Sequence, residues 1–209
     1  MEAGVEPGLQ SGLGIVQVDV GDADLGKSQF MCPDPQLLRE PLQIDVVKDA
    51  WLHLHAPILE SRSQIWPDEA ACAACATALA ARPALRDAYV ALHGGLGAGK
   101  TTFVRHLLRA LGQHGRIRSP SYAVLEPYSL PGLEISHFDF YRFADPREWE
   151  DAGFRELFGA PGLKLAEWPE KAAALLPAPD LELSIGVDDD ERRQVRFDAR
   201  SARGVALLP

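Results

Sequence analysis

The chain has 209 residues, a length that allows one full domain with an appendage or two very small domains, and its content of 46% hydrophobic and 24% charged residues is typical of a soluble globular protein. Its formal net charge of −9 excludes an overall basic field for gripping a nucleic-acid backbone, so any nucleic acid would be held through a partner or a local patch. No signal peptide is recognisable, and no apolar run reaches the ~20 residues that a membrane helix needs, so we expect a cytoplasmic protein.

The first 60 residues do not resemble an independent domain. They are rich in glycine and proline and contain only two short apolar strings, Ile15–Val20 and Ile44–Leu54. So little periodicity rarely supports a core of its own. We therefore expect a poorly ordered extension over residues 1–60 and one domain over residues 61–209.

Regular signals for helices and strands begin after residue 60. Apolar spacing, proline and glycine predict helices over Pro67–Ala81, Thr101–Leu111, Pro146–Asp151, Phe154–Phe158 and Lys171–Leu176. The same signals predict strands over Ala88–His93, Ser121–Tyr128, Leu133–Asp139, Leu163–Glu167, Leu181–Val187 and Gln194–Phe197. Strands that alternate with helices around a glycine-rich turn predict an α/β fold, a three-layer P-loop NTPase-like sandwich with a mixed, mostly parallel central sheet.

Two stretches match the phosphate-loop pattern G-x-x-x-x-G-K-[ST]. The first, Gly21–Ser28, is followed by prolines at positions 33 and 35 that would break the helix such a loop needs, and it contains two aspartates that would repel phosphate. The second, Gly94–Thr101, follows a predicted strand and opens an amphipathic helix. Only the second combines backbone N–H groups, a helix N-terminus and Lys100 in the arrangement that binds a triphosphate.

Two carboxylates at the ends of predicted strands are candidates for the chemistry around Mg²⁺. Asp139 and Glu167 each follow an apolar run, and the carboxyl edge of an α/β sheet is where such folds bind ligands. With the Thr101 hydroxyl they offer the oxygen ligands that Mg²⁺ prefers, and Glu167 could instead orient or deprotonate water. By themselves, the residues also allow Asp139 to be a turn cap and Glu167 a surface residue before a proline turn.

Four segments, in this order and spacing, resemble the TsaE (YjeE) family of bacterial P-loop ATPases. They are HGGLGAGKTTFVRHLLRALG, RSPSYAVLEPY, HFDFYRFADPREWEDAGFRELF and LAEWPE. The resemblance implies binding of ATP and Mg²⁺ and slow ATP hydrolysis by the protein alone. It also implies that the protein acts together with the TsaB–TsaD pair, which makes threonylcarbamoyladenosine in tRNA. By the same resemblance, tRNA would be bound mainly by these partners.

The resemblance also implies roles for individual residues. By this resemblance, we expect Lys100 and Glu167 to be catalytic. We expect Thr101, Asp139 and Glu167 to bind the metal. The residues it assigns to the nucleotide are Gly95, Leu96, Gly97, Ala98, Gly99, Lys100, Thr101, Thr102, Ser121 and Trp168. Ser121 stands where the family usually has threonine, which keeps the hydroxyl, and Gly95 stands where an acidic or amide residue is common.

Two other functions use the same phosphate loop. A small-molecule kinase would pass the γ-phosphate to a metabolite, but only 108 residues follow Thr101, which leaves little room for an acceptor site and a lid. A non-catalytic, nucleotide-gated binding module would not need Glu167. The pair Cys72 and Cys75 lies in an alanine-rich helix without a second pair of metal ligands, and we expect packing rather than metal or redox chemistry.

Overall fold

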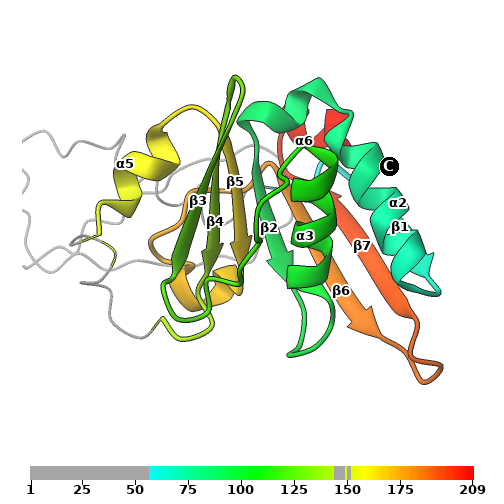
Figure 1. Cartoon of the computed structure of the whole chain (residues 1–209). Helices are drawn as coiled ribbons and strands as arrows, with labels where there is room; N and C mark the ends of the chain where they lie inside the picture. Colours follow the sequence, from blue (N-terminus) through cyan, green and yellow to red (C-terminus); the bar gives the residue numbers. More distant parts are fainter. Residues whose placement is uncertain (1–56, 144–148, 150–151) are drawn as a thin grey trace, which may run out of the picture. The chain divides into compact units, whose positions relative to one another are not determined.

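A computed structural model of the chain describes residues 57–143, 149 and 152–209 (Figure 1). The strands are β1 (Glu60–Trp66), β2 (Tyr89–His93), β3 (Leu125–Leu130), β4 (Leu133–Asp139), β5 (Leu163–Glu167), β6 (Leu181–Val187) and β7 (Arg193–Ala199). The α-helices are α2 (Glu69–Ala80), α3 (Lys100–Ala110), α5 (Phe154–Gly159) and α6 (Ala202–Leu207), with 3-10 helices η2 (Pro83–Asp87) and η3 (Pro169–Ala172). The extension over residues 1–56, with the Gly21–Ser28 match, and nearly all of the helix predicted over Pro146–Asp151 lie outside the described residues.

The described strands form one seven-stranded sheet in the order β1-β7-β6-β2-β5-β4-β3. β2 pairs in parallel with β5 and β6, and β4 pairs in parallel with β5, while the other three pairs are antiparallel. Five of the seven strands therefore run in the same direction, and the predicted mixed α/β sheet is confirmed.

Helices cover both faces of this sheet (Figure 1). On one face, α2 and α3 pack through a core that includes Phe103, Leu107 and Leu165. On the other face, α5 packs through an aromatic cluster in which the Phe138 ring stacks on Phe158 at a centroid distance of 4.8 Å. Because successive side chains of a strand point to opposite faces, β4 and β5 contribute to both cores.

The sequence located most elements correctly, but it missed some and misplaced others. The strand predicted over Ser121–Tyr128 starts only at Leu125, because a turn occupies residues 121–123 and Val124 has a left-handed backbone with φ 63°. The predicted helix Lys171–Leu176 is wrong, since the regular turn there is the 3-10 helix η3 two residues earlier, which begins at a proline. β1 and α6 were not predicted at all.

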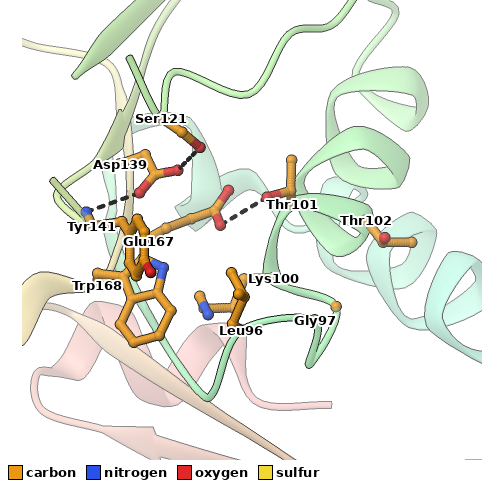
Figure 2. A pocket seen from close by; sticks show the side chains of 11 residues that line it. Leu96, Gly97, Lys100, Thr101, Thr102, Ser121, Asp139, Tyr141, Glu167 and Trp168 are labelled. Atoms are coloured by element: carbon orange, nitrogen blue, oxygen red, sulfur yellow. Dashed lines mark hydrogen bonds between the residues drawn. The ribbon is translucent and has the colours of Figure 1, made fainter. Parts of the chain in front are cut away.

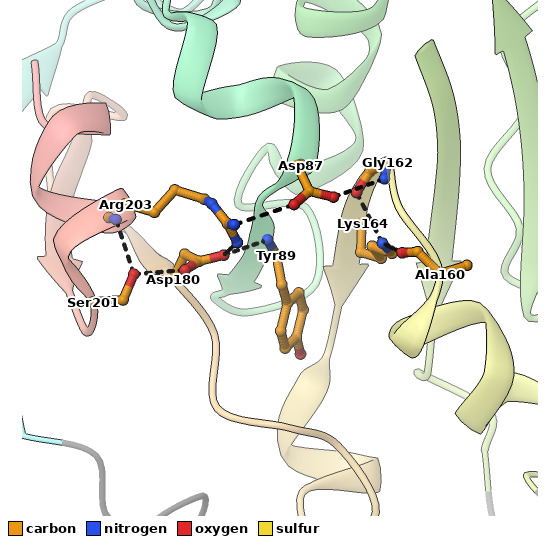
Figure 3. Close-up of polar contacts among 9 residues, drawn as sticks. Asp87, Tyr89, Ala160, Gly162, Lys164, Asp180, Ser201 and Arg203 are labelled. Carbon is orange, nitrogen blue, oxygen red and sulfur yellow. Dashed lines mark hydrogen bonds and ion pairs between the residues drawn. The ribbon is translucent and has the colours of Figure 1, made fainter.

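Asp87 and Asp180, which precede β2 and β6, hold α6 against the sheet through ion pairs and hydrogen bonds (Figure 3). Asp180 accepts hydrogen bonds from the Tyr89 backbone at 2.9 Å and from the Ser201 hydroxyl at 2.5 Å. Arg203 pairs with Asp180 at 3.2 Å and with Asp87 at 3.1 Å. Two carboxylates thus neutralise one arginine, and each also accepts a backbone hydrogen bond at 2.9 Å, Asp180 from Tyr89 and Asp87 from Gly162.

Gly204 lets α6 approach this network closely, which gives a stability prediction. A Cβ atom at Gly204 would lie 1.8 Å from the Asp180 carbonyl oxygen, so alanine there must push α6 away from the β6 terminus. We expect Gly204→Ala to lower the free energy of unfolding by about 2–4 kcal/mol, measured by urea denaturation. Gly159→Ala, where a Cβ meets nothing within 4 Å, is the control, and equal stability of the two variants would contradict the prediction.

Candidate functional site

The loop between β2 and α3 has the backbone of a phosphate cradle. Gly97 and Gly99 have φ values of 78° and 114°, and Gly99 caps the N-terminus of α3. A Cβ at Gly94 (φ 142°) would lie 2.5 Å from the Ile185 carbonyl oxygen, so only glycine fits between the loop and β6. Free N–H groups at a helix N-terminus and a glycine-rich turn together form a site for anions.

Lys100 is the first residue of α3, and its largely buried side chain extends back into the loop. Its ammonium group donates to the carbonyl oxygens of Gly94 at 2.6 Å and Gly95 at 2.9 Å, and it lies 3.8 Å from the Trp168 ring centroid. Burial lowers the pKa of Lys100, while the carboxylates of Glu167, Glu170 and Asp139 act in the opposite direction. A cation held at this point is placed to meet the charge of a phosphate.

Glu167 ends β5 with its carboxylate held between two partners. One oxygen accepts a hydrogen bond from the Thr101 hydroxyl at 2.8 Å (Figure 2), and the other lies 2.9 Å from Nε2 of His137. The Glu167 side chain is only 2% exposed. It therefore does not lie on the surface, and the alternative of a surface glutamate before a proline turn is wrong.

Asp139 ends the neighbouring strand β4, directly opposite Glu167 in the parallel pair. One carboxylate oxygen accepts from the Tyr141 backbone N–H at 3.0 Å, and the other accepts from the Ser121 hydroxyl at 2.6 Å (Figure 2). The turn-capping alternative is thus correct for one oxygen. The other oxygen lies on the site side, linked to the segment that precedes β3.

One pocket brings the P-loop and both carboxylates together (Figure 2). Its lining residues are Leu96, Gly97, Gly99, Lys100, Thr101, Thr102, Ser121, Asp139, Tyr141, Glu167 and Trp168. Of the residues expected to bind the nucleotide, Gly95 and Ala98 do not line it; Ala98 is buried in the core.

Two neighbours of the site were not identified from the sequence. Tyr141 lines the pocket and lies against Trp168 at a ring-centroid distance of 5.1 Å, while His137 contacts Glu167 from behind. Their positions in the HFDFYR segment, two residues before and after Asp139, were the available signal. His137 shares a face of β4 with Asp139, because alternate residues of a strand share a face, and Tyr141 lies in the turn that follows the strand.

The donor set around the pocket fits Mg²⁺. The hydroxyl of Thr101 and the carboxylates of Asp139 and Glu167 are hard oxygen ligands, and Mg²⁺ commonly takes one or two protein ligands and completes its shell with phosphate and water. No cluster of three or more histidine, cysteine or acidic side chains suited to a metal occurs among the described residues.

A family model described as threonylcarbamoyl adenosine biosynthesis protein TsaE matches residues 66–195, more than half of the chain. The chain belongs to the TsaE family. It is similar to the tRNA threonylcarbamoyladenosine biosynthesis protein TsaE of Haemophilus influenzae, with 45% identity over 103 residues, 49% of this chain and 65% of the relative. The match therefore spans slightly less than two thirds of that relative.

Two comparisons with Bacillus subtilis proteins extend the similarity within the TsaE family. The TsaE protein of that organism is 35% identical over 133 residues, 64% of this chain and 81% of the relative. The crystal structure of Bacillus subtilis YdiB superposes with a TM-score of 0.59 at 27% identity, covering 71% of this chain and 91% of the YdiB chain. The family, and the P-loop fold expected from it, are thus shown.

Gly95, where the resemblance to the TsaE family leads us to expect an acidic or amide residue, has room for a side chain. A Cβ there meets nothing within 4 Å, and Gly95 is not among the glycines with positive φ. We expect Gly95→Glu to change the free energy of unfolding by less than about 0.5 kcal/mol, measured by urea denaturation. A loss above 2 kcal/mol, the size expected for Gly94→Ala in the same loop, would show that Gly95 is required by the fold.

The remaining motifs are explained by packing and turns. Cys72 and Cys75 lie on α2, and burial raises their pKa values to about 12 and about 11, which makes them poor thiolates. His93 is partly exposed, with its Nδ1 3.2 Å from Glu170. None of the described helices has the length and apolar character required to cross a membrane.

Proposed function

We propose that this chain is a Mg²⁺-dependent ATPase that acts in the cytoplasm in the synthesis of threonylcarbamoyladenosine in tRNA. The observation that carries the proposal is the convergence of Lys100, Thr101, Asp139 and Glu167 on one pocket, with the two carboxylates directly opposite each other on parallel strands. Membership of the TsaE family supports the pathway.

Each group has a distinct task in this proposal. Backbone N–H groups of the loop and the Lys100 ammonium bind the phosphates, and Trp168 packs beside the nucleotide. Thr101, with Asp139 or Glu167, holds Mg²⁺, which neutralises charge on the phosphates when bound. Glu167 is fixed from both sides and orients or deprotonates the attacking water.

The partnership with TsaB and TsaD is part of the same proposal. A chain with net charge −9 is poorly suited to hold tRNA alone, so most of the tRNA contact is assigned to the partners. The activity of the isolated chain is accordingly slow and is stimulated by the TsaB–TsaD pair.

One set of assays separates this function from the two alternatives. ATP and Mg²⁺ are incubated with the chain, with and without TsaB–TsaD and unmodified tRNA, and free phosphate and labelled products are followed. Release of phosphate that TsaB–TsaD stimulates supports the ATPase. Transfer of the label to a metabolite would identify a kinase, and binding of ATP without turnover under every condition would identify a nucleotide-gated module.

A further inference from the structure

Cationic side chains gather on one segment of this acidic protein. Between Arg105 and Arg118 the sequence has four arginines, two histidines and no acidic residue. The four arginines are exposed. We call them the basic surface: Arg105, Arg109, Arg116 and Arg118.

The structure brings these four residues to one region. The Tyr128 hydroxyl donates to the Arg118 carbonyl oxygen at 3.4 Å. Burial raises the pKa of Tyr128, while the positive charges of Arg105 on α3 and of Arg118 in the following loop both act to lower it. Arg109 donates to the carbonyl oxygens of Gln113 at 2.6 Å and Gly115 at 2.8 Å. The loop that carries Arg116 and Arg118 is thereby tied to the C-terminal half of α3.

Three of these guanidinium groups are available for a ligand. In the part of the chain that the structure describes, those of Arg105, Arg116 and Arg118 make no hydrogen bond or ion pair. Some exposed arginines elsewhere pair with carboxylates; Arg192 pairs with Asp188 at 3.0 Å, and Arg203 pairs with Asp87 at 3.1 Å. Exposed Arg82, Arg86 and Arg142 donate instead to carbonyl or hydroxyl oxygens, and they are not clustered along one segment. Unpaired, clustered guanidinium groups match the geometry and charge of phosphates.

We propose that the basic surface binds phosphates of an RNA backbone, which, resting on the proposed function, is that of the substrate tRNA. A protein partner fits less well, because protein interfaces have an apolar centre and no residue from 105 to 118 is among the exposed large hydrophobic residues of the described chain. A phosphate backbone, in contrast, is bound by positively charged side chains, and a planar guanidinium group can donate to two phosphate oxygens at once.

The same loop connects this surface to the nucleotide site. Arg118 precedes Ser119 and Ser121, whose hydroxyls donate to one oxygen of Asp139 at 3.4 and 2.6 Å. An RNA phosphate bound by Arg118 therefore restrains the segment that contacts an Asp139 oxygen. The basic surface is placed to make RNA contact and nucleotide binding depend on each other.

The test is binding of a fluorescently labelled, unmodified tRNA transcript to the full chain, followed by anisotropy at several salt concentrations. The variant is Arg116→Gln with Arg118→Gln. The control is Arg62→Gln with Arg192→Gln, which removes the same charge from arginines that already have carboxylate partners. We expect the first pair to weaken binding by on the order of tenfold and to reduce the salt slope by about two, and the control to change affinity less than about twofold.

Three results would overturn the proposal: no binding of tRNA by the unaltered chain at low salt, equal losses in both pairs, or unchanged tRNA binding with lost capture of TsaB–TsaD. The last would assign the surface to a protein partner. The assay contains no ATP, so its outcome is independent of whether the chain hydrolyses ATP.

A separate observation concerns His137, a fully buried side chain on β4. Its Nε2 lies 2.9 Å from Glu167, and its Nδ1 is buried with no hydrogen-bond partner among the described residues. A buried nitrogen without a partner costs free energy, so packing alone does not explain a histidine here. The useful contact is the one with Glu167.

We infer that His137 is a positioning residue for Glu167, an inference that also rests on the proposed function. Nε2–H donates to one carboxylate oxygen while the Thr101 hydroxyl donates to the other, so the carboxylate cannot rotate away from the pocket. Losing the donor should lower the turnover number and leave nucleotide affinity nearly unchanged, because Lys100 and the loop bind the phosphates.

Two amide variants test this role. In His137→Gln the amide reaches the position of Nε2, whereas in His137→Asn it is too short. We expect kcat within about threefold of the unaltered chain for Gln and at least tenfold lower for Asn, with KM similar in both. Crystal structures of both should keep the Thr101–Glu167 contact in the Gln variant and lose it in the Asn variant.

Equal rates for the two variants, or an unmoved Glu167 in the Asn structure, would overturn the inference. Absence of hydrolysis by the unaltered chain would instead count against the ATPase proposal, and the two crystal structures would still decide whether His137 positions Glu167.

Discussion

Replacing Lys100 with alanine is expected to weaken ATP binding at least 100-fold. The ammonium group lies inside the P-loop, within 3 Å of two loop carbonyl oxygens, where it can reach a phosphate without leaving the pocket. Charge-assisted hydrogen bonds contribute about 1.5–3 kcal/mol each, so the loss of two accounts for an effect of this size. Titration calorimetry with a non-hydrolysable ATP analogue and Mg²⁺ measures it directly.

Lys171→Ala is the matched control for this change. Lys171 is exposed in η3, close in sequence to Trp168 but not among the residues that line the pocket. We expect its affinity for the analogue to stay within about twofold. Similar losses in both variants would mean that general electrostatic attraction, and not the P-loop geometry, binds the nucleotide.

Replacing Glu167 is expected to separate binding from turnover. Glu167→Ala should keep ATP affinity within a fewfold while lowering kcat by about 10²–10⁴, the range that a positioned general base or water-orienting group contributes. Glu167→Gln is expected to give a similar loss, because it preserves the side-chain volume but not the charge. Phosphate release under saturating ATP and Mg²⁺ gives kcat, and calorimetry gives the affinity.

Glu170→Gln provides the control for Glu167. Glu170 lies three residues later, is largely exposed and contacts His93 at the rim of the loop. It should retain near-normal turnover. Normal hydrolysis by Glu167→Ala would show that this carboxylate is not the catalytic one, and the assignment would then have to pass to Asp139.

The P-loop and the two carboxylates could be predicted from the sequence because each depends on local signals. Gly94–Thr101 has a strand before it and an amphipathic helix after it, and Asp139 and Glu167 each end an apolar strand. The carboxyl ends of parallel neighbours meet at one edge, so their convergence follows from topology once β4 and β5 are adjacent.

What the sequence did not reveal depends on contacts between distant residues. β1 pairs with β7, more than 120 residues away, and nothing in ESRSQIW indicates that partner. His137 resembles any residue of an amphipathic strand until β5 places Glu167 beside it. The sequence predicts a strand from Ser121, but in the structure Ser121 lies in a turn, where its hydroxyl donates to Asp139.

A crystal structure of the chain with Mg²⁺ and a non-hydrolysable ATP analogue tests the proposed site most directly. We expect the β- and γ-phosphates to lie against the Gly94–Thr101 backbone and Lys100, with the metal bound by Thr101 and at least one of Asp139 and Glu167. A triphosphate bound elsewhere, or a metal that contacts neither carboxylate, would contradict the proposal that this pocket binds and hydrolyses ATP.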